Sequence, residues 1–417
     1  MGLGAVYGSV LSPEPKLPVS VLDLSVLLLA VGGLGLLFDG LAWWSGHRHF
    51  KKKILPDPPT WPQVLMVKPV AGLDVGAREN FLSLIHQDYP SFSIVFVVSS
   101  SNDPVLPLIK EMCSLAPDRV SLKVVDGPRG ANRKISNVFL LMEQNAFSNE
   151  PYILLNDSDI RVGRDYLKSI VREAHEDPSI GMVTCFQRGN PSGSGTSQIA
   201  SVMLNTEAIP QGLLAKALAP VDFAYGPTML MRRDALEKMG GFAPIRDLLA
   251  DDFHLAQGMI REGYRIVLSE YIVDAQIPDQ SLLSFWEQER RWVITYRSCR
   301  PLGYAFSILL RPFPFLLGSG VLFEASGYAL SAFSSLLIWS LHLLILSDIA
   351  KRFVSRPIPW SRMYLLLFRE ILSLALYFAS YGHQIVWRGR RFSVQKGGGL
   401  LELDQSTKPQ KQQHPFS

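Results

Sequence analysis

The apolar residues of this chain gather near its two ends, whereas short apolar runs separated by polar turns occupy the middle. Residues 24–38 carry no charge, and the apolar character resumes after Asp39 and continues through Trp44. That length suffices for a helix across a bilayer, which needs about 20 residues. A basic stretch at residues 47–53 follows directly. Since a secretory signal peptide carries its charges before its apolar stretch, this order predicts an uncleaved anchor with a cytoplasmic basic flank, in preference to a buried helix of a soluble domain.

The second apolar region lies near the C-terminus. Between residues 304 and 347 only Arg311 and Glu324 carry a charge, and proline and glycine interrupt the stretch. This pattern predicts two apolar helices, near residues 304–324 and 327–347.

A third apolar segment, residues 363–387, contains Arg369 and Glu370 and has basic residues on both sides. It either spans the membrane or forms a re-entrant or interfacial helix, and the distribution of positive charge favours the second. The last residues, from 393 to 417, are rich in Gln, Lys and Pro at their end and are expected to be a disordered tail.

The middle of the chain, residues 61–300, alternates β-rich apolar runs with helical patterns, which predicts an α/β domain around a largely parallel sheet. The expected strands are residues 64–67, 94–98, 120–125 and 153–155. Ligands bind beyond the carboxyl ends of strands in such sheets. Attention therefore falls on Asp103, which follows the second run, and on residues 156–159, which follow the fourth.

The amino-acid composition excludes several classes of protein. Of the 417 residues, 47% are apolar and only 19% are charged, which excludes disorder for most of the chain. The formal charge of +4 is too small to suggest a nucleic-acid binder. Three widely spaced cysteines form neither a disulfide framework nor a zinc cluster and fit a reducing compartment.

Asp157 and Asp159 form an Asp-x-Asp at the end of the fourth apolar run. Two carboxylates that close repel each other unless a cation or hydrogen bonds neutralise them. A hard divalent cation, Mg²⁺ or Mn²⁺, would neutralise them if it bridged the two carboxylates to a diphosphate. The alternative is a turn in which the side chains only bind backbone groups, and the strand-end position leaves the two readings balanced.

Asp251 and Asp252 precede an apolar-periodic helix. Aspartate is a favoured helix cap, but only one of two adjacent carboxylates can cap, so we favour a functional base for one of them. Further along, Gln288, Arg291 and Trp292 share one helix face. That face either belongs to an interfacial belt at the bilayer surface or contacts an anionic diphosphate and an acceptor, and spacing alone does not decide.

Together these residues resemble the D, D, D, (Q/R)xxRW signature of inverting nucleotide-sugar glycosyltransferases, and more closely the ceramide glucosyltransferase family. The resemblance covers nearly all of residues 61–300 and, more loosely, both apolar ends. Several motifs in the right order are specific, whereas any one alone is weak. The matching residues are Lys68-Pro69, Asn80, Gln87 to Pro90, Asn102 to Pro104, Asn132, Lys134, Asn137, Asp157-Ser158, Ile160 to Val162, Met231 to Asp234, Asp252, Gln288 to Trp292, Trp387 to Arg391 and Gly397-Gly398.

The resemblance implies a GT-A-type fold with a UDP-sugar donor, a lipid acceptor and a divalent cation. It assigns Asp103, Asp157 and Lys134 to nucleotide-sugar binding and Asp157 with Asp159 to the metal. It makes Asp252 the general base and places Gln288, Arg291 and Trp292 on the acceptor and diphosphate side, with Arg291 offsetting charge on the leaving UDP.

Two departures concern the substrates. Asp159 stands where the animal ceramide enzymes have glycine, which implies firmer metal coordination. Residues 300–304 look more like bacterial relatives associated with hopanoid biosynthesis, which transfer N-acetylglucosamine to a hopanoid polyol. Glucose and N-acetylglucosamine both remain candidate sugars, and ceramide and a hopanoid polyol both remain candidate acceptors.

The sequence thus predicts a membrane anchor over residues 1–60, a catalytic domain over 61–300, membrane or interfacial helices over 301–392 and a tail over 393–417. The catalytic domain is expected to face the cytoplasm, at a bacterial inner membrane, and the oligomeric state stays open. One rival is a processive polysaccharide synthase, which shares the acidic residues and the RW motif but needs a channel of long membrane helices. Another is a catalytically dead lipid-binding scaffold, which would be expected to lack some of the acidic set.

Overall fold

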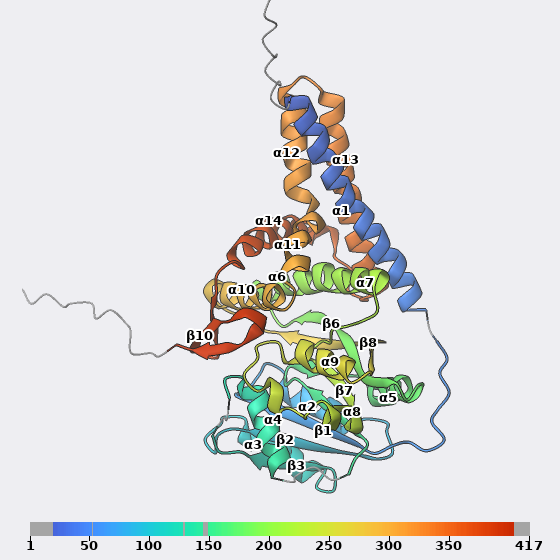
Figure 1. Ribbon diagram of the computed structural model, residues 1–417, viewed down its shortest axis with the longest axis vertical. Coiled ribbons are helices and arrows are strands. Elements are labelled where there is room, and N and C mark those ends of the chain that lie inside the picture. Colours follow the sequence, from blue (N-terminus) through green and yellow to red (C-terminus); the bar gives the residue numbers. More distant parts are fainter. Residues whose placement is uncertain (1–19, 52, 128–129, 145–148, 404–417) are drawn as a thin grey trace, which may run out of the picture.

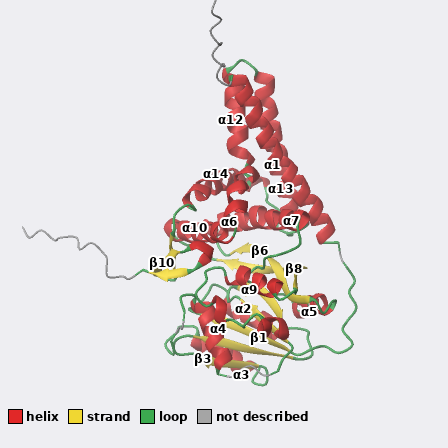
Figure 2. Ribbon diagram, in the orientation of Figure 1, coloured by secondary structure: helices red, strands yellow, loops and turns green. Residues whose placement is uncertain are grey.

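The protein consists of an α/β domain surmounted by a stalk of apolar helices (Figures 1 and 2). The computed structural model describes residues 20–403, apart from residues 52, 128–129 and 145–148. Helices α6 (Thr196–Met203), α7 (Ile209–Leu218), α10 (Leu282–Cys299) and α14 (Tyr364–Ala379) lie between the sheet and the stalk (Figure 1). A short π-helical segment, Leu204–Ala208, joins α6 to α7.

The sheet of the α/β domain has eight strands in the order β3-β2-β1-β4-β7-β6-β8-β5. Strands β3, β2, β1 and β4 are parallel to one another, and β6 is parallel to β8. Strand β7 pairs antiparallel with both β4 and β6, and β5 pairs antiparallel with β8. The strands are β1 (Val64–Val70), β2 (Phe92–Val98), β3 (Val120–Val124), β4 (Tyr152–Asn156), β5 (Ile160–Arg161), β6 (Ile180–Pro191), β7 (Thr228–Arg232) and β8 (Arg265–Ile277). The helices of this domain are α2 (Ala77–Ile85), α3 (Leu106–Leu115), α4 (Arg133–Glu143), α5 (Tyr166–His175), α8 (Arg233–Lys238) and α9 (Asp251–Arg261).

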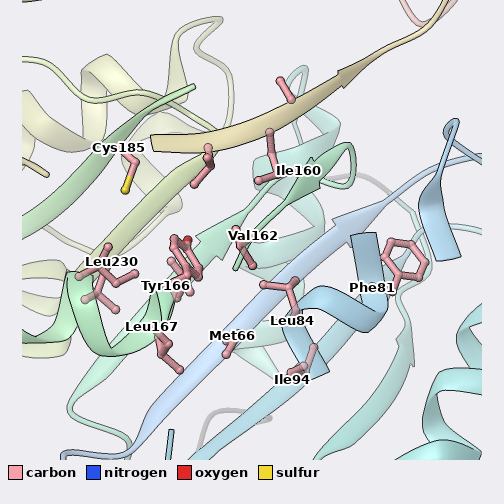
Figure 3. Close-up of a cluster of buried hydrophobic side chains, with 14 of the residues drawn as sticks. Met66, Phe81, Leu84, Ile94, Ile160, Val162, Tyr166, Leu167, Cys185 and Leu230 are labelled. Carbon is pink, nitrogen blue, oxygen red and sulfur yellow. The ribbon is translucent and has the colours of Figure 1, made fainter. Parts of the chain in front are cut away.

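Both faces of the sheet are covered, so its central strands are apolar on both sides. Successive residues of β1 belong to opposite layers: Met66 packs in one buried cluster, and Leu65 and Val67 pack in the other. Figure 3 shows part of the first cluster, in which Met66 and Ile94 from neighbouring strands pack with side chains from α2 and α5. This burial explains why the sequence reads as short continuous apolar runs.

The stalk contains α1 (Val21–His49), α12 (Pro312–Ala325) and α13 (Ala329–Arg352). Helices α1 and α13 are each long and apolar enough to cross a membrane. A third crossing is formed if α12 is taken together with the preceding segment Pro301–Leu310, which contains α11 (Pro301–Phe306) and meets α12 at a bend of 45°. The two apolar helices expected near residues 304–347 are therefore present, with the first one broken before Pro312.

Small residues bring α1 close to α12. A Cβ added at Gly32 would lie 2.4 Å from Leu316, and one at Gly35 would lie 3.0 Å from Pro312. The hydroxyl of Ser319 donates to the backbone oxygen of Ser25 at 2.8 Å. Small residues and a polar contact of this kind hold helices together where lipid removes the hydrophobic driving force.

Helix α14 does not continue the stalk but lies across its base (Figure 1). It has 16 residues, too few for a bilayer that requires about 20. Arg369 and Glu370 are buried against the protein, with the guanidinium of Arg369 donating to Thr206 O at 2.7 Å. The non-spanning alternative for residues 363–387 thus agrees with the structure.

The expectation of a disordered tail from residue 393 is wrong for its first eleven residues. A three-stranded antiparallel sheet forms from β9 (Gln384–Trp387), β10 (Arg390–Val394) and β11 (Leu400–Glu402). Its apolar side, with Ile385 and Phe392, packs on Ile294 of α10. That partner lies about 100 residues away in sequence, so no local pattern predicts the packing. The remaining tail residues, 404–417, lie outside the described part of the chain.

Candidate active site

Three charged side chains from distant parts of the chain meet at Gly226. Asp157 follows β4, Lys134 lies in the first turn of α4, and Asp252 lies in the first turn of α9. A Cβ added at Gly226 would lie 3.5 Å from Asp157 Oδ2, 3.6 Å from Asp252 Oδ2 and 3.6 Å from Lys134 Nζ. The lack of a side chain at this position therefore leaves open the space among the three groups.

Lys134 is the centre of the charge network. Its ammonium lies 2.8 Å from Asp157 Oδ1 and 2.9 Å from Asp251 Oδ2. Burial lowers the pKa of Lys134, but the charges of Asp157 and Asp251 outweigh it and raise the pKa above its ordinary value. Lys134 is therefore a permanent cation that links the end of β4 to the start of α9.

The two adjacent aspartates have different environments. Asp252 Oδ2 accepts from the Gly226 backbone N–H at 3.0 Å, and Oδ1 accepts from the Phe253 N–H at 2.8 Å. Burial and the charge of Asp251 raise the pKa of Asp252 to about 7, against the opposing effects of these N–H groups and Lys134. The N-cap of α9 is Ala250, so neither aspartate is a side-chain cap. A carboxyl group with a pKa near neutrality is suited to take a proton.

A buried lysine, Lys68, is hydrogen-bonded to the residues at the end of β4 that lead into the Asp-x-Asp. Lys68 of β1 is fully buried and donates to Asn156 Oδ1 and to Asp157 O, both at 2.6 Å. Asn156 in turn donates to Pro227 O at 2.7 Å. Burial lowers the pKa of Lys68 to about 8 despite the neighbouring carboxylates. These bonds fix the end of β4 relative to the loop that carries Gly226.

Asp159 and Asp157 are close enough to repel each other. The pKa of Asp159 is raised to about 7. Burial has the largest effect, and the charges of Asp157 and Asp74 add to it. Asp74 also accepts a hydrogen bond from the Ser158 hydroxyl. Among the described residues no group of three or more side chains forms a complete protein cage for a metal. Two carboxylates with open positions fit Mg²⁺ or Mn²⁺, which binds through one or two carboxylates, with substrate phosphates and water completing the shell.

Asp103 lies on the far side of β1 from this network, after β2. Both of its carboxylate oxygens lie 3.0 Å from the Gly72 N–H, and Oδ1 also accepts from the Val105 N–H. Asp103 therefore holds together the loops that follow β1 and β2. Among the described residues it forms no ion pair with Lys134, whose partners are Asp157 and Asp251.

Helix α10 supplies the last predicted residues. The guanidinium of Arg291 lies 5.7 Å from the Trp387 ring centroid, and Arg291 makes no ion pair among the described residues. Burial lowers the pKa of Arg291, although the charges of Glu289 and Asp157 act to raise it. Gln288 accepts a hydrogen bond from Gln280 at 3.4 Å, and Trp292 is partly buried on the same helix. The charge of Asp157 thus acts on Arg291, whereas neither Gln288 nor Trp292 forms a hydrogen bond with Lys134, Asp157 or Asp252 among the described residues.

Three contributors to this site had no assigned role in the sequence. Gly226 and Asp74 carry no local signal, because their importance depends on which loops meet. Lys68 stands within the family pattern, yet only the fold reveals that it bonds Asn156 and the backbone of Asp157. The partner of Asp251, Lys134, likewise becomes evident only when α4 and α9 are in place.

The family of the chain follows from its sequence match over the same elements. Residues 28–400 match the family described as "Glycosyl transferase family 21". The chain belongs to this family. The enzyme is therefore a glycosyltransferase, and its eight-stranded α/β sheet, with apolar helices at both ends, confirms the predicted fold class.

One curated relative matches most of the enzyme, and another matches a short part of it. It is 23% identical over 377 residues to "Ceramide glucosyltransferase 1" of Caenorhabditis elegans, a match that covers 88% of this chain and 79% of the relative. A shorter match, 31% over 94 residues, is to "Ceramide glucosyltransferase" of Komagataella phaffii and covers 21% of this chain and 18% of the relative. Among solved structures, a mannosyltransferase from Pyrobaculum calidifontis in complex with GDP-Man and Mn²⁺ has a TM-score of 0.49 and 20% identity, covering 86% of this chain and 97% of that one.

Proposed function

We propose that the enzyme moves one hexose, glucose or N-acetylglucosamine, from a UDP-sugar to a hydroxyl of a lipid acceptor, ceramide-like or a hopanoid polyol, with inversion to a β-glycolipid. The observation that carries the proposal is the meeting of Lys134, Asp157 and Asp252 at Gly226. A cation, an acidic pair and a carboxyl group of raised pKa are the groups that departure of a diphosphate and deprotonation of a hydroxyl require. The names of the nematode and yeast relatives support glucose and ceramide.

In the proposed reaction Asp252 accepts the proton of the acceptor hydroxyl. The hydroxyl oxygen forms a bond to the anomeric carbon while the bond from that carbon to the UDP oxygen breaks, and UDP leaves with the electron pair. Attack from the face opposite UDP converts an α-linked donor into a β-linked product. Gly226 donates its N–H to Asp252 Oδ2 at 3.0 Å and has no side chain beside that carboxylate, which supports access of the acceptor to the base.

Other residues hold the donor. Asp157 and Asp159 would hold a divalent cation, which offsets the diphosphate charge when bound. Lys134 and Arg291 add positive charge beside Asp157, Asp103 positions the nucleoside end, and Gln288 with Trp292 faces the acceptor. The basic flank of α1 and the cytosolic supply of nucleotide sugars support a catalytic domain in the cytoplasm, at the inner membrane of a bacterium.

The test is transfer by the purified full-length enzyme. Labelled UDP-glucose and UDP-N-acetylglucosamine are each supplied with ceramide or with a hopanoid polyol, with Mn²⁺ present, and the lipid extract is analysed by mass spectrometry. A lipid carrying one hexose, with the β-configuration by NMR, is expected from one of the four pairs. A ladder of polymer, or no sugar incorporation and no release of UDP from any pair, would contradict the proposal.

A further inference from the structure

The C-terminal sheet contains a hairpin, β9 to β10, whose turn contacts the catalytic domain at Ala71. Strands β9 and β10 are joined by only two residues, Arg388 and Gly389, since Trp387 pairs with Arg390. Both linking residues have positive φ, 49° at Arg388 and 76° at Gly389. A two-residue turn of this kind prefers asparagine or glycine at its first position. Arginine strains the backbone there and does not stabilise the turn.

The side chain of Arg388 reaches the donor side of the catalytic domain. Its guanidinium donates to the backbone oxygen of Ala71 at 2.8 Å. The next residue, Gly72, donates its N–H to Asp103 at 3.0 Å. Arg388 therefore adjoins the loop that Asp103 fixes, on the side where the nucleotide is proposed to lie.

Arg388 also lies near Arg291. Arg291 lies over the ring of Trp387, the residue directly before Arg388, and the charge of Arg388 contributes to lowering the pKa of Arg291 after the larger effect of burial. Neither arginine has a carboxylate partner in the part of the chain that the structure describes. Arg390 in the same hairpin, by contrast, is paired with Glu402. Two like charges that approach repel each other, and an anion bound by both guanidinium groups would offset that repulsion.

We propose that Arg388 joins Arg291, which the family resemblance already places on the diphosphate side, in binding the diphosphate of the nucleotide donor, so that the C-terminal hairpin forms one wall of the donor site. The inference rests on the proposed function, because the diphosphate is the anion that a UDP-sugar brings to this place. Guanidinium groups suit it, since their paired N–H donors match phosphate oxygens. The packing of Phe392 and Ile385 on α10 gives the hairpin a fixed position relative to Arg291.

The variant Arg388→Asn tests whether the Arg388 side chain binds the diphosphate, because it removes the guanidinium and should leave the turn intact. Asparagine is better suited than arginine to the positive φ, so the hairpin should be kept and the melting temperature should stay equal or rise. Arg391→Asn is the matched control, because it removes an exposed arginine three residues along the same hairpin. Calorimetry on the full-length enzyme with Mn²⁺ compares UDP with UMP, which lacks the second phosphate.

We expect Arg388→Asn to weaken UDP binding about 10-fold or more while UMP binding stays within about 2-fold, as the loss of one charge-assisted contact predicts. Arg391→Asn should bind both nucleotides like the parent. Unchanged UDP affinity in Arg388→Asn, or equal losses for UDP and UMP, would overturn the assignment of Arg388 while leaving the proposed function intact. A parent enzyme that binds no UDP would overturn the proposed function and the role of Arg388 with it.

Discussion

The ammonium of Lys134 lies 2.8 Å from the Oδ1 atom of Asp157, and this contact joins the first turn of α4 to the end of β4. The same ammonium reaches Asp251 at the start of α9. One cation thus connects the carboxylate proposed to hold the metal to the helix that carries the proposed base. The position of Asp157 relative to α9 is in this way fixed by two ion pairs of one lysine.

The acidic pair provides the first prediction. Asp157→Ala and Asp159→Ala should each lose metal-dependent UDP-sugar binding, because each removes an oxygen ligand from a hard cation. Asp118→Ala, an exposed aspartate on the same domain, is the control and should bind like the parent. Calorimetry with UDP, with and without Mn²⁺, measures the effect. Unchanged Mn²⁺-dependent affinity in both variants would exclude a metal site at the Asp-x-Asp.

A second prediction concerns the space at Gly226. Gly226→Ala places a methyl group at ordinary contact distance from Asp157, Asp252 and Lys134, so the fold should accept it. The methyl would occupy the space where donor and acceptor are proposed to meet, and turnover should fall about 10-fold or more. Gly33→Ala, whose Cβ meets no atom within 4 Å, should leave turnover unchanged. Parental turnover in Gly226→Ala with an unchanged melting temperature would place the reaction elsewhere.

The sequence predicts much of this domain because its signals are local. The runs that became β1, β2 and β4 are apolar on both faces, and the Asp-x-Asp follows β4 directly. The remainder depends on distant contacts. No pattern near residue 393 indicates that Phe392 packs on Ile294, and nothing near Gly226 indicates that three charges surround it. The strand-end rule predicts where the candidate site lies, whereas its ion pairs depend on how the loops meet.

Titration of Asp252 leads to a third prediction. Its pKa is raised to about 7, and only the deprotonated form can act as a base. Turnover at saturating donor and Mn²⁺ should therefore rise with pH through about 7 and level off above it, falling about tenfold per pH unit on the acid side. A pH series of initial rates checks this. A rate that is flat from pH 5 to pH 8 would contradict the role of a carboxyl group with this pKa.

Membrane orientation gives a fourth prediction. With the basic end of α1 in the cytoplasm, the exposed residue Lys110 on α3 lies on the cytoplasmic side. In a Cys113→Ser background, Lys110→Cys should react with a membrane-impermeant maleimide only after cells are permeabilised. Labelling of intact cells would reverse the topology, and labelling of the background protein without the new cysteine serves as the control.

The central claim is that Asp252, and not its neighbour Asp251, is the general base. Asp252→Asn keeps the size of the side chain but cannot usefully take a proton, whereas Asp251→Asn loses only the pairing with Lys134. The decisive measurement is turnover of both variants, by UDP release in the presence of the lipid acceptor, alongside their UDP affinity and melting temperature. We predict that Asp252→Asn falls about 10²-fold or more with near-parental affinity and stability, while Asp251→Asn costs much less. Turnover of Asp252→Asn within a few-fold of the parent, together with its loss in Asp251→Asn, would contradict the account.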